Sequence, residues 1–405
     1  MKRRIGLTVL LVGILVGYGL ISKGEVQAGP PQELVINHIG DITGPYAATI
    51  GVRGVMACKD VQDYINSRGG IKGVKVKIVI HDTRNKRDVA IAKYTELAAQ
   101  KPPILVIQQV ADQEVLKERL AEDKIPGFGV GGTDKVNWPP GWVFQSSPPY
   151  TDQFALFLDW LRSDWKKTGK IRLAFVNPDY QYGRSHLTPE VEEYIKKKGI
   201  DVVANEFFPP FDLDATTQFT RVAAAKPDAI FSMTIATQVK VALKGAEAAG
   251  LKGVLYGMGP WGVDAATARG TGELMEGVVG ISPTWVPSDT TVPLVKDIVA
   301  KFEAEKRNKD DMNVAYSILW LTNAAVIEAI TKTVDRVGWD KLSGEEVYKT
   351  MVTPADYKTM GLAPFKFSPK GRCSVNARIV KITKGETVAI SDWQPCPDMR
   401  PAQYK

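Results

Sequence analysis

Hydrophobic residues follow two alternating periods along this chain of 405 residues. Short runs that are continuously apolar, or apolar at every second position, alternate with longer segments whose apolar residues recur every three to four positions. The first pattern is typical of buried strands and the second of amphipathic helices. Such alternation predicts an α/β fold with parallel sheets and right-handed crossovers. The predicted strands cover 34–39, 74–80, 104–107, 127–130, 171–176, 202–207, 229–233, 254–257 and 278–281.

The helical period is clearest between residues 151 and 167. One face of this segment is apolar, and charged residues occupy the other faces. The stretch 313–334 is almost wholly apolar from 318 to 330, so we expect this helix to be buried. The other predicted helices cover 52–67, 88–99, 113–122, 238–249 and 293–307.

The alternation stops twice, and these interruptions divide the chain. SSPPY at 146–150 precedes a new series of strands and helices, and SPTWVPSDTTVP at 282–293 precedes the last two predicted helices. Without the apolar N-terminal segment, roughly 375 residues remain, which is more than one hydrophobic core usually organises. We therefore expect two units, each a doubly wound parallel sheet.

The N-terminus has the plan of a secretory signal peptide. Lys2, Arg3 and Arg4 precede an apolar run at 5–21, and Val26-Gln27-Ala28 resembles a cleavage site. We expect residues 1–28 to be removed near Ala28 and the protein to be periplasmic. A retained membrane anchor is the alternative, but the run is short and is interrupted by glycines.

Composition and motifs narrow the function classes. The formal net charge is +7, and residues 1–28 carry +3 of it, so the remaining +4 gives no reason to expect a nucleic-acid partner. No G-x-S-x-G elbow, P-loop or zinc signature occurs, and the three histidines are scattered. We therefore expect neither an enzyme nor a metal or cofactor site.

The three cysteines suggest two roles. Cys58 shares one predicted helix face with Val55 and Val61, which favours a buried, inert thiol. Cys373 and Cys396 flank a hairpin-like unit, and disulfides persist in exported proteins. A Cys373–Cys396 bridge is a possibility that the sequence leaves open.

The corner after the first strand is unusually open. Residues 40–51 contain Gly44, Pro45 and Gly51 before the next helix begins. In open α/β sheets, ligands bind outside the carboxyl ends of the strands, where such loops lie. The stretch alone is equally consistent with a plain surface loop.

Several stretches resemble a known family when they are taken in order. IGDITGPYAATIG at 39–51, INSRGGIKGVKVKIVIHD at 65–82, VNPDYQYG at 176–183 and MGPWG at 258–262 resemble type I periplasmic binding proteins. The closest resemblance is to the branched-chain amino-acid family of ABC importers. It extends over essentially the whole chain after the predicted signal peptide.

The resemblance implies two doubly wound lobes joined by a hinge of three crossovers, near 146–148, 283–285 and 375–377. Lobe 1 would hold 31–146 and 284–376, and lobe 2 would hold 147–283 and 377–405. A monomer would close these lobes on a small-molecule ligand and present it to ABC permease subunits. A ligand-sensing receptor or regulator of the same fold is the alternative function.

The resemblance also places the ligand between the lobes. In amino-acid binders of the family, lobe 1 holds a carboxylate with hydroxyls and backbone amides at a helix N-terminus. The matching stretch, QQVADQEV at 108–115, has no Ser or Thr, and we expect Asp112 to be an N-cap rather than a ligand contact. The implied site residues are Tyr46, Ile50, Val110, Ala111, Asp112, Gly132, Thr133, Tyr182, Thr234 and Trp261.

Trp261 departs from the family pattern, which has an acidic residue in a Gly-Pro-acid run to bind the substrate ammonium. Leaving a buried ammonium without this carboxylate costs about 3 kcal/mol, or more than a hundredfold in affinity. An aromatic side chain instead offers about 150–250 Å² of surface for burial. We therefore expect an aromatic or organic acid or amide rather than a plain α-amino acid. The alternatives are that another acidic residue replaces the lost one, or that Trp261 only packs beneath its loop.

Overall fold

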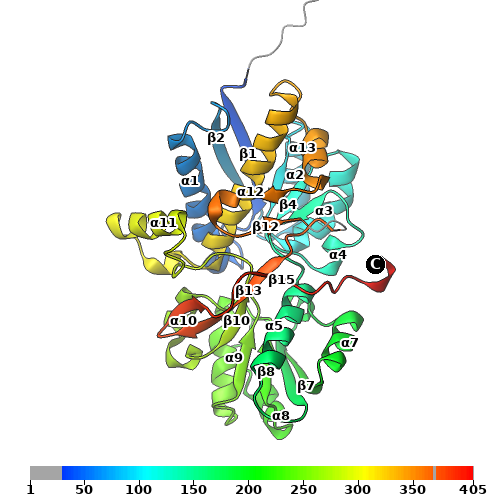
Figure 1. The fold of residues 1–405 in the computed structure, drawn as a ribbon, viewed down its shortest axis with the longest axis vertical. Helices are drawn as coiled ribbons and strands as arrows, with labels where there is room; N and C mark the ends of the chain where they lie inside the picture. The colour runs from blue at the N-terminus through cyan, green and yellow to red at the C-terminus, as the bar shows by residue number, and fades with distance from the viewer. Residues whose placement is uncertain (1–29, 368–370, 405) are drawn as a thin grey trace, which may run out of the picture.

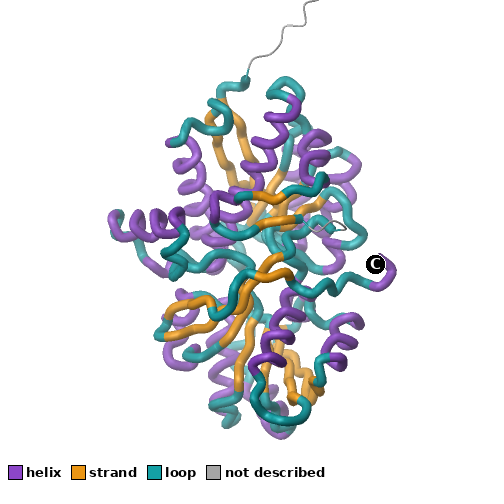
Figure 2. Tube along the Cα trace, viewed as in Figure 1, coloured by secondary structure: helices purple, strands orange, loops and turns teal. Residues whose placement is uncertain are grey.

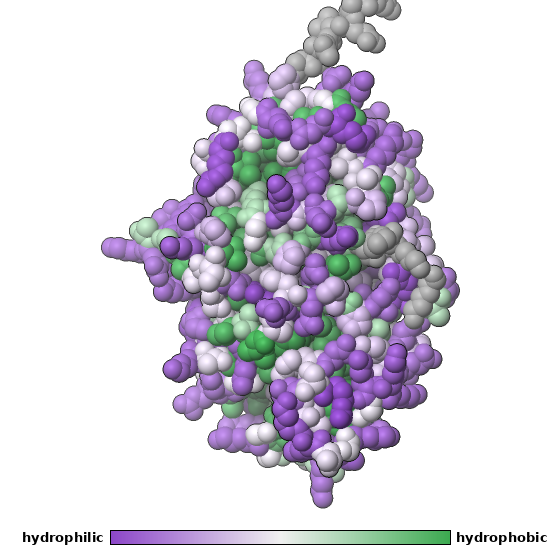
Figure 3. Space-filling model, in the orientation of Figure 1, coloured by the Kyte–Doolittle hydropathy of each residue, from purple (hydrophilic) through white to green (hydrophobic). Residues whose placement is uncertain are grey.

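The computed structural model describes residues 30–367 and 371–404, and it consists of two lobes, one above the other in Figure 1. The predicted signal peptide lies outside the described residues. Figure 2 shows that each lobe has its own group of strands with helices around it. On the face seen in Figure 3, hydrophilic residues cover the outer edges of both lobes, with smaller hydrophobic patches between them.

The first lobe contains a parallel five-stranded sheet in the order β2-β1-β3-β4-β5. Helices and a short π-helix connect these strands on either face. The strands are β1 (Glu33–Gly40), β2 (Lys75–Asp82), β3 (Leu105–Ile107), β4 (Gly127–Gly129) and β5 (Val143–Gln145), and the helices are η1 (Ala47–Gly51), α1 (Val52–Ser67), α2 (Arg87–Ala98), α3 (Val110–Glu122) and α4 (Asp134–Asn137).

The second lobe is built on an eight-stranded sheet with the main order β14-β13-β10-β9-β8-β6-β7. Its parallel part comprises β6 (Ile171–Pro178), β7 (Ile200–Phe208), β8 (Ala229–Ser232), β9 (Leu255–Met258) and β10 (Val279–Ser282). The helices of this lobe are α5 (Tyr150–Asp164), α6 (Gln181–Arg184), α7 (Pro189–Lys197), α8 (Thr216–Ala224), α9 (Ala236–Ala248), α10 (Ala265–Thr271) and η2 (Gly272–Met275).

After β10 the chain returns to the first lobe and then crosses back. The returning elements are α11 (Pro293–Ala304), η3 (Lys309–Asp311), α12 (Val314–Val337), α13 (Gly344–Val352), β11 (Asp356–Tyr357), η4 (Thr359–Gly361) and β12 (Phe365–Lys366). The final segment adds the antiparallel strands β13 (Asn376–Thr383), β14 (Glu386–Ala389) and β15 (Gln394–Pro395), and ends in η5 (Ala402–Tyr404). The chain therefore passes between the two sheets three times.

Helix α12 is the core helix of the first lobe. It packs against α1 and α13, and Tyr316, Leu319 and Trp320 are all buried. Among the described residues it is the one helix long and apolar enough to cross a membrane, yet 89% of its most apolar stretch is buried inside the protein. Its apolar character is explained by burial on nearly every side, as the sequence predicts.

The cysteines differ in part from expectation. Cys58 is buried, as its helix face predicts, but Cys373 and Cys396 are free and the possible bridge between them is not formed. The thiol of Cys373 instead lies 3.2 Å from Asn137 Oδ1. The amide of Cys396 donates to Val375 O at 2.8 Å, which holds the C-terminal segment on β13 without a disulfide.

Candidate functional site

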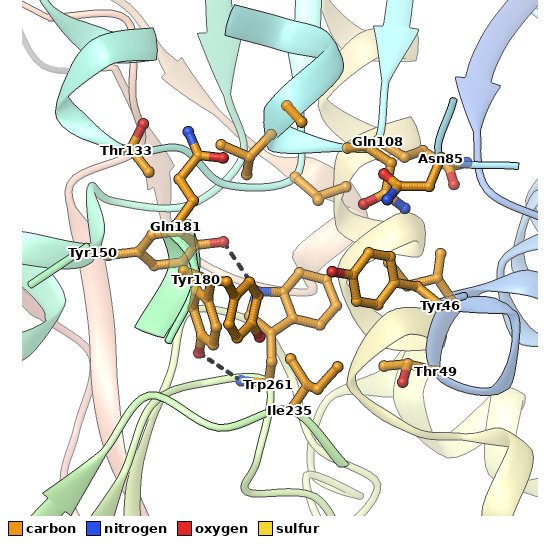
Figure 4. Close-up of a pocket in the computed structure, with 16 residues that line it drawn as sticks. Tyr46, Thr49, Asn85, Gln108, Thr133, Tyr150, Tyr180, Gln181, Ile235 and Trp261 are labelled. Carbon is orange, nitrogen blue, oxygen red and sulfur yellow. Dashed lines mark hydrogen bonds between the residues drawn. The ribbon is translucent and has the colours of Figure 1, made fainter. Parts of the chain in front are cut away.

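A cavity of about 140 Å³ lies between the lobes, beyond the carboxyl ends of β1, β3, β6 and β8. This is the edge at which open α/β sheets bind ligands. Figure 4 shows its side chains converging from both lobes. The cavity is lined by Tyr46, Thr49, Ile50, Asn85, Gln108, Gln109, Val110, Ala111, Val130, Thr133, Tyr150, Tyr180, Gln181, Tyr182, Ile235 and Trp261.

Two carboxylates fix the open corner that precedes Tyr46. Asp41 accepts the amides of Gly44 at 2.6 Å and Tyr46 at 3.0 Å. Asp82, at the end of β2, accepts the Ile42 amide at 2.9 Å and the Thr43 hydroxyl at 2.5 Å. A side chain at Gly44 would place its Cβ 2.5 Å from Asp41 Oδ1, so this packing requires glycine. The corner is therefore a fixed support that carries Tyr46 and η1 to the cavity.

The N-terminus of α3 presents hydrogen-bond donors to the cavity. Gln109 is the N-cap, and no side chain caps the helix. The first amides of a helix have no partner within it, and Val110 and Ala111 line the cavity. The Gln109 side-chain nitrogen Nε2 is buried with no partner among the described residues. This wall can therefore hold an anion.

Asp112 does not have the expected role. The helix begins at Val110, so Asp112 is its third residue rather than its N-cap, and it is not among the residues that line the cavity. Burial, together with the charge of nearby Asp41, raises the pKa of Asp112 to about 6, against a hydrogen bond with Thr83 that lowers it. Asp112 thus lies behind this wall of the cavity.

The second lobe contributes an aromatic wall. The indole nitrogen Nε1 of Trp261 donates to the Tyr150 hydroxyl at 3.0 Å, and the Trp261 amide donates to the Tyr182 hydroxyl at 3.5 Å. The rings of Tyr150 and Tyr182 meet edge to face with centroids 4.9 Å apart. These bonds fix the indole at the cavity surface rather than beneath its loop (Figure 4).

A third group of side chains joins the two lobes beside the cavity. Thr133 Oγ1 in the first lobe donates to Glu114 Oε1 at 2.8 Å. Gln181 Nε2 in the second lobe donates to the same carboxylate oxygen. The half-buried Glu114 therefore bridges residues of both lobes.

Most implied site residues lie at the cavity. Tyr46, Ile50, Val110, Ala111, Thr133, Tyr182 and Trp261 line it, whereas Asp112, Gly132 and Thr234 do not. Gly132 packs against Gln145, and Thr234 is fully buried. Sequence reasoning missed Thr49, Asn85, Gln108, Gln109, Val130, Tyr150, Tyr180, Gln181 and Ile235. Several of these belong to stretches already quoted, namely QQVADQEV, VNPDYQYG and SSPPY.

A buried Cys-His-Asn group lies behind Gln108. Cys58 Sγ is 3.8 Å from His38 Nδ1, and His38 Nε2 is 3.0 Å from Asn323 Oδ1. Nucleophilic catalysis requires an ionisable, accessible thiol. Burial instead raises the pKa of Cys58 to about 12 and lowers the pKa of His38 to about 4, so both are neutral at pH 7. The group is thus a neutral core network, and no metal-binding cluster occurs within 30–367 and 371–404.

The sequence of residues 33–387 matches the periplasmic binding protein family. The chain belongs to this family. Among curated relatives, the Leu/Ile/Val-binding protein of Escherichia coli (strain K12) is 24% identical to this periplasmic binding protein over 312 residues. The aligned region covers 76% of this chain and 81% of the relative. The family comprises solute-binding proteins rather than enzymes, and the resemblance seen in the sequence is confirmed.

Solved structures show the same fold. A branched-chain amino acid ABC transporter protein from Thermus thermophilus with bound valine matches with a TM-score of 0.81 at 20% identity, over 93% of this chain and all of that chain. A solute binding protein from Rhodopseudomonas palustris BisB5, in complex with 3,4-dihydroxy benzoic acid, matches with a TM-score of 0.72 at 18% identity, over 91% and 99% of the two chains. The predicted fold class, with two α/β lobes, is therefore confirmed.

Proposed function

We propose that this periplasmic binding protein captures a small aromatic or organic acid, or its amide, and delivers it to the permease subunits of an ABC importer. One observation carries the ligand class: none of the sixteen residues that line the cavity has a charged side chain. Burying an unpaired ammonium is strongly unfavourable, so a free α-amino acid lacks its main partner here.

A carboxylate, in contrast, has partners in the cavity. The free amides at the start of α3 and the Gln109 Nε2 donor favour an anionic group at the first-lobe wall. Trp261, Tyr46 and Tyr182 offer aromatic surface to the rest of the ligand. The related fold accommodates valine in one protein and a dihydroxybenzoic acid in another, and Trp261 favours the second kind of ligand here.

The proposal includes the place of action. Residues 1–28 would direct export and be removed near Ala28, leaving a monomer in the periplasm. Family membership supports this location because these proteins act outside the cytoplasm. Closure of the two lobes would then signal ligand occupancy to the permease.

Isothermal titration calorimetry on the purified mature protein tests the ligand class. The panel contains benzoate, 4-hydroxybenzoate, phenylacetate, benzamide, leucine and valine. We expect at least one aromatic acid to bind with a Kd near 1 μM, or about −8 kcal/mol, and leucine to bind more than a hundredfold more weakly. Leucine or valine binding as tightly as the best aromatic acid would overturn the proposal.

A further inference from the structure

We propose that Glu114 determines ligand specificity by making the adjoining corner of the pocket a hydrogen-bond acceptor. The corner is formed by Thr133 and Gln181, which both line the cavity and both donate to Glu114. Within the proposed ligand class, the preferred ligand is therefore an acid that also carries a hydroxyl or a neutral N–H donor. This inference rests on the proposed function, because it refines the ligand of the same site.

The hydroxyl of Thr133 has a single proton to donate. A carboxylate only accepts hydrogen bonds, so the Thr133 hydroxyl donates its one proton to Glu114 Oε1, at 2.8 Å. For any further hydrogen bond, the Thr133 oxygen then has only its two lone pairs, which are acceptors. Thr133 therefore cannot donate to a ligand carboxylate as a free hydroxyl would, but it can accept from a ligand hydroxyl or N–H group.

The side chain of Gln181 likewise offers an acceptor to the pocket. Its amide nitrogen donates to Glu114, and Figure 4 shows this nitrogen on the side of Thr133 with the amide oxygen toward the middle of the pocket. An amide oxygen is an acceptor. Two acceptors thus adjoin each other beside the cavity, and both orientations depend on Glu114.

The charges also orient the ligand. The free amides of Val110 and Ala111 attract an anion to the start of α3, whereas the Glu114 carboxylate repels one from the corner. An acid with a donor group would satisfy both walls at once. An acid without a donor would leave the corner acceptors unpaired, which is costly in a closed site.

The corner exists only when the lobes meet. Thr133 and Glu114 belong to the first lobe, and Gln181 follows β6 in the second. Donor recognition is therefore coupled to closure, because opening the lobes removes Gln181 from Glu114.

Matched ligand pairs test this inference in wild type, Glu114→Gln and the control Glu118→Gln, an exposed residue on the same helix. The pairs are benzoate and 4-hydroxybenzoate, phenylacetate and mandelate, and 4-methylpentanoate and leucine. For the pair that binds, calorimetry should show that wild type and Glu118→Gln prefer the donor-bearing member by about tenfold. Glu114→Gln should reduce this preference to about twofold while still binding the parent acid. An unchanged preference in Glu114→Gln would overturn the inference.

The design separates this inference from the proposed function. If leucine is the only ligand that binds, the proposed ligand class fails, but the effect of Glu114→Gln on the leucine pair still decides the role of Glu114. If no ligand binds, small-angle X-ray scattering of the ligand-free proteins decides it. Glu114→Gln should then have a larger radius of gyration than Glu118→Gln, and identical radii would overturn the inference.

Discussion

At the residue scale, Trp261 gives the cavity an aromatic surface. It stands where the resembled family places an acidic residue, and hydrogen bonds to Tyr150 and Tyr182 hold both its indole and its backbone. This pocket therefore has a fixed aromatic surface at the position where the resembled family has a negative charge. This one position argues against an ammonium and in favour of an aromatic or apolar ligand body.

Trp261→Ala should weaken the binding of the best aromatic acid about 30-fold. The substitution removes apolar contact worth about 2 kcal/mol and leaves the Tyr150 hydroxyl without its donor. Calorimetry with the best ligand from the panel measures the change. Trp165→Ala, outside the cavity, is the control and should bind as wild type does. Equal affinities in the two variants would contradict the assigned role of Trp261.

His186 makes stability depend on pH. It is fully buried near the rings of Phe154, Phe175 and Phe231, and neither ring nitrogen has a hydrogen-bond partner among the described residues. Burial lowers the pKa of His186 to about 3, whereas an unfolded histidine has a pKa of about 6.5. As pH falls from 6.5 to 3, the unfolded chain binds the proton and the folded protein does not, so stability is lost across this window.

His186→Phe should remove this loss. Relative to wild type, the free energy of unfolding of the variant should rise by about 1.4 kcal/mol for each pH unit below 6.5. Urea denaturation of the variant and of wild type at pH 7.5, 6 and 5 measures the difference between their free energies of unfolding. The contributions of all other titrating groups cancel in this difference. A steric cost of the larger ring would be the same at each pH. A difference that stays constant with pH would contradict the prediction.

Several implied site residues that line the cavity, such as Tyr46 and Trp261, lie in the stretches quoted for the family resemblance, whereas Asp112 is not the N-cap that we expected. The helix predicted from the sequence begins at Gln113, whereas α3 starts at Val110, and its first two residues line the cavity. The N-cap of α3 is Gln109, which is not one of the residue types that usually mark a helix start. The same reason explains why Gln109 was missed.

At the scale of elements, all nine predicted strands occur and the hairpin-like unit after Cys373 is the antiparallel pair β13 and β14, whereas β5, β11, β12 and β15 were not predicted. All nine belong to the parallel parts of the two sheets, where apolar runs are diagnostic, although the edge strands β2 and β7 are only partly buried. Strand β5 is only three residues long, and β15 has two exposed residues, so neither carries a readable period. The pairing of β13 with β10 joins segments that are distant in the sequence, which local patterns do not encode.

Helices α1, α11 and α12 are joined by a buried carboxylate. Asp60 on α1 accepts hydrogen bonds from Lys301 at 2.9 Å, Arg307 at 2.6 Å and the Tyr316 hydroxyl at 2.7 Å. Burial alone would raise the pKa of Asp60, but these hydrogen bonds outweigh it and the pKa lies below its usual value. The group fixes α11 and the start of α12 on the first lobe.

Asp60→Ala should destabilise the protein by about 3 kcal/mol, because it leaves buried donors and cations without their acceptor. Chemical denaturation at pH 7 measures the loss. The matched control is Asp63→Ala on the same helix, whose exposed pair with Lys59 should be worth less than about 0.5 kcal/mol. Similar losses in both variants would show that Asp60 does not organise these helices.

At the scale of the whole molecule, side-chain contacts between the lobes supplement the three chain connections. The Gln181–Glu114 bond lies beside the pocket, and Arg269 on α10 pairs with Asp310 of η3 at 2.6 Å. Arg269 also pairs with Glu386 in its own lobe, at 2.7 Å. Such contacts favour the closed arrangement before any ligand contributes, and apparent affinity depends on the population of that arrangement.

Asp310→Asn should therefore weaken ligand binding without touching the ligand. The cross-lobe pair is partly exposed, with side chains 33% and 40% accessible, so its loss should cost about 0.2–1 kcal/mol, or up to about fivefold in Kd. Arg269 keeps its partner Glu386, so folding stability should change little. Glu206→Gln, which removes the partner of Arg221 within the second lobe, is the matched control and should leave Kd unchanged. Titration of both variants with the best ligand measures their Kd values. A higher Kd in Asp310→Asn alone would show that the Arg269–Asp310 pair contributes to closing the lobes. Equal Kd values in both variants would mean that this pair does not contribute to closure.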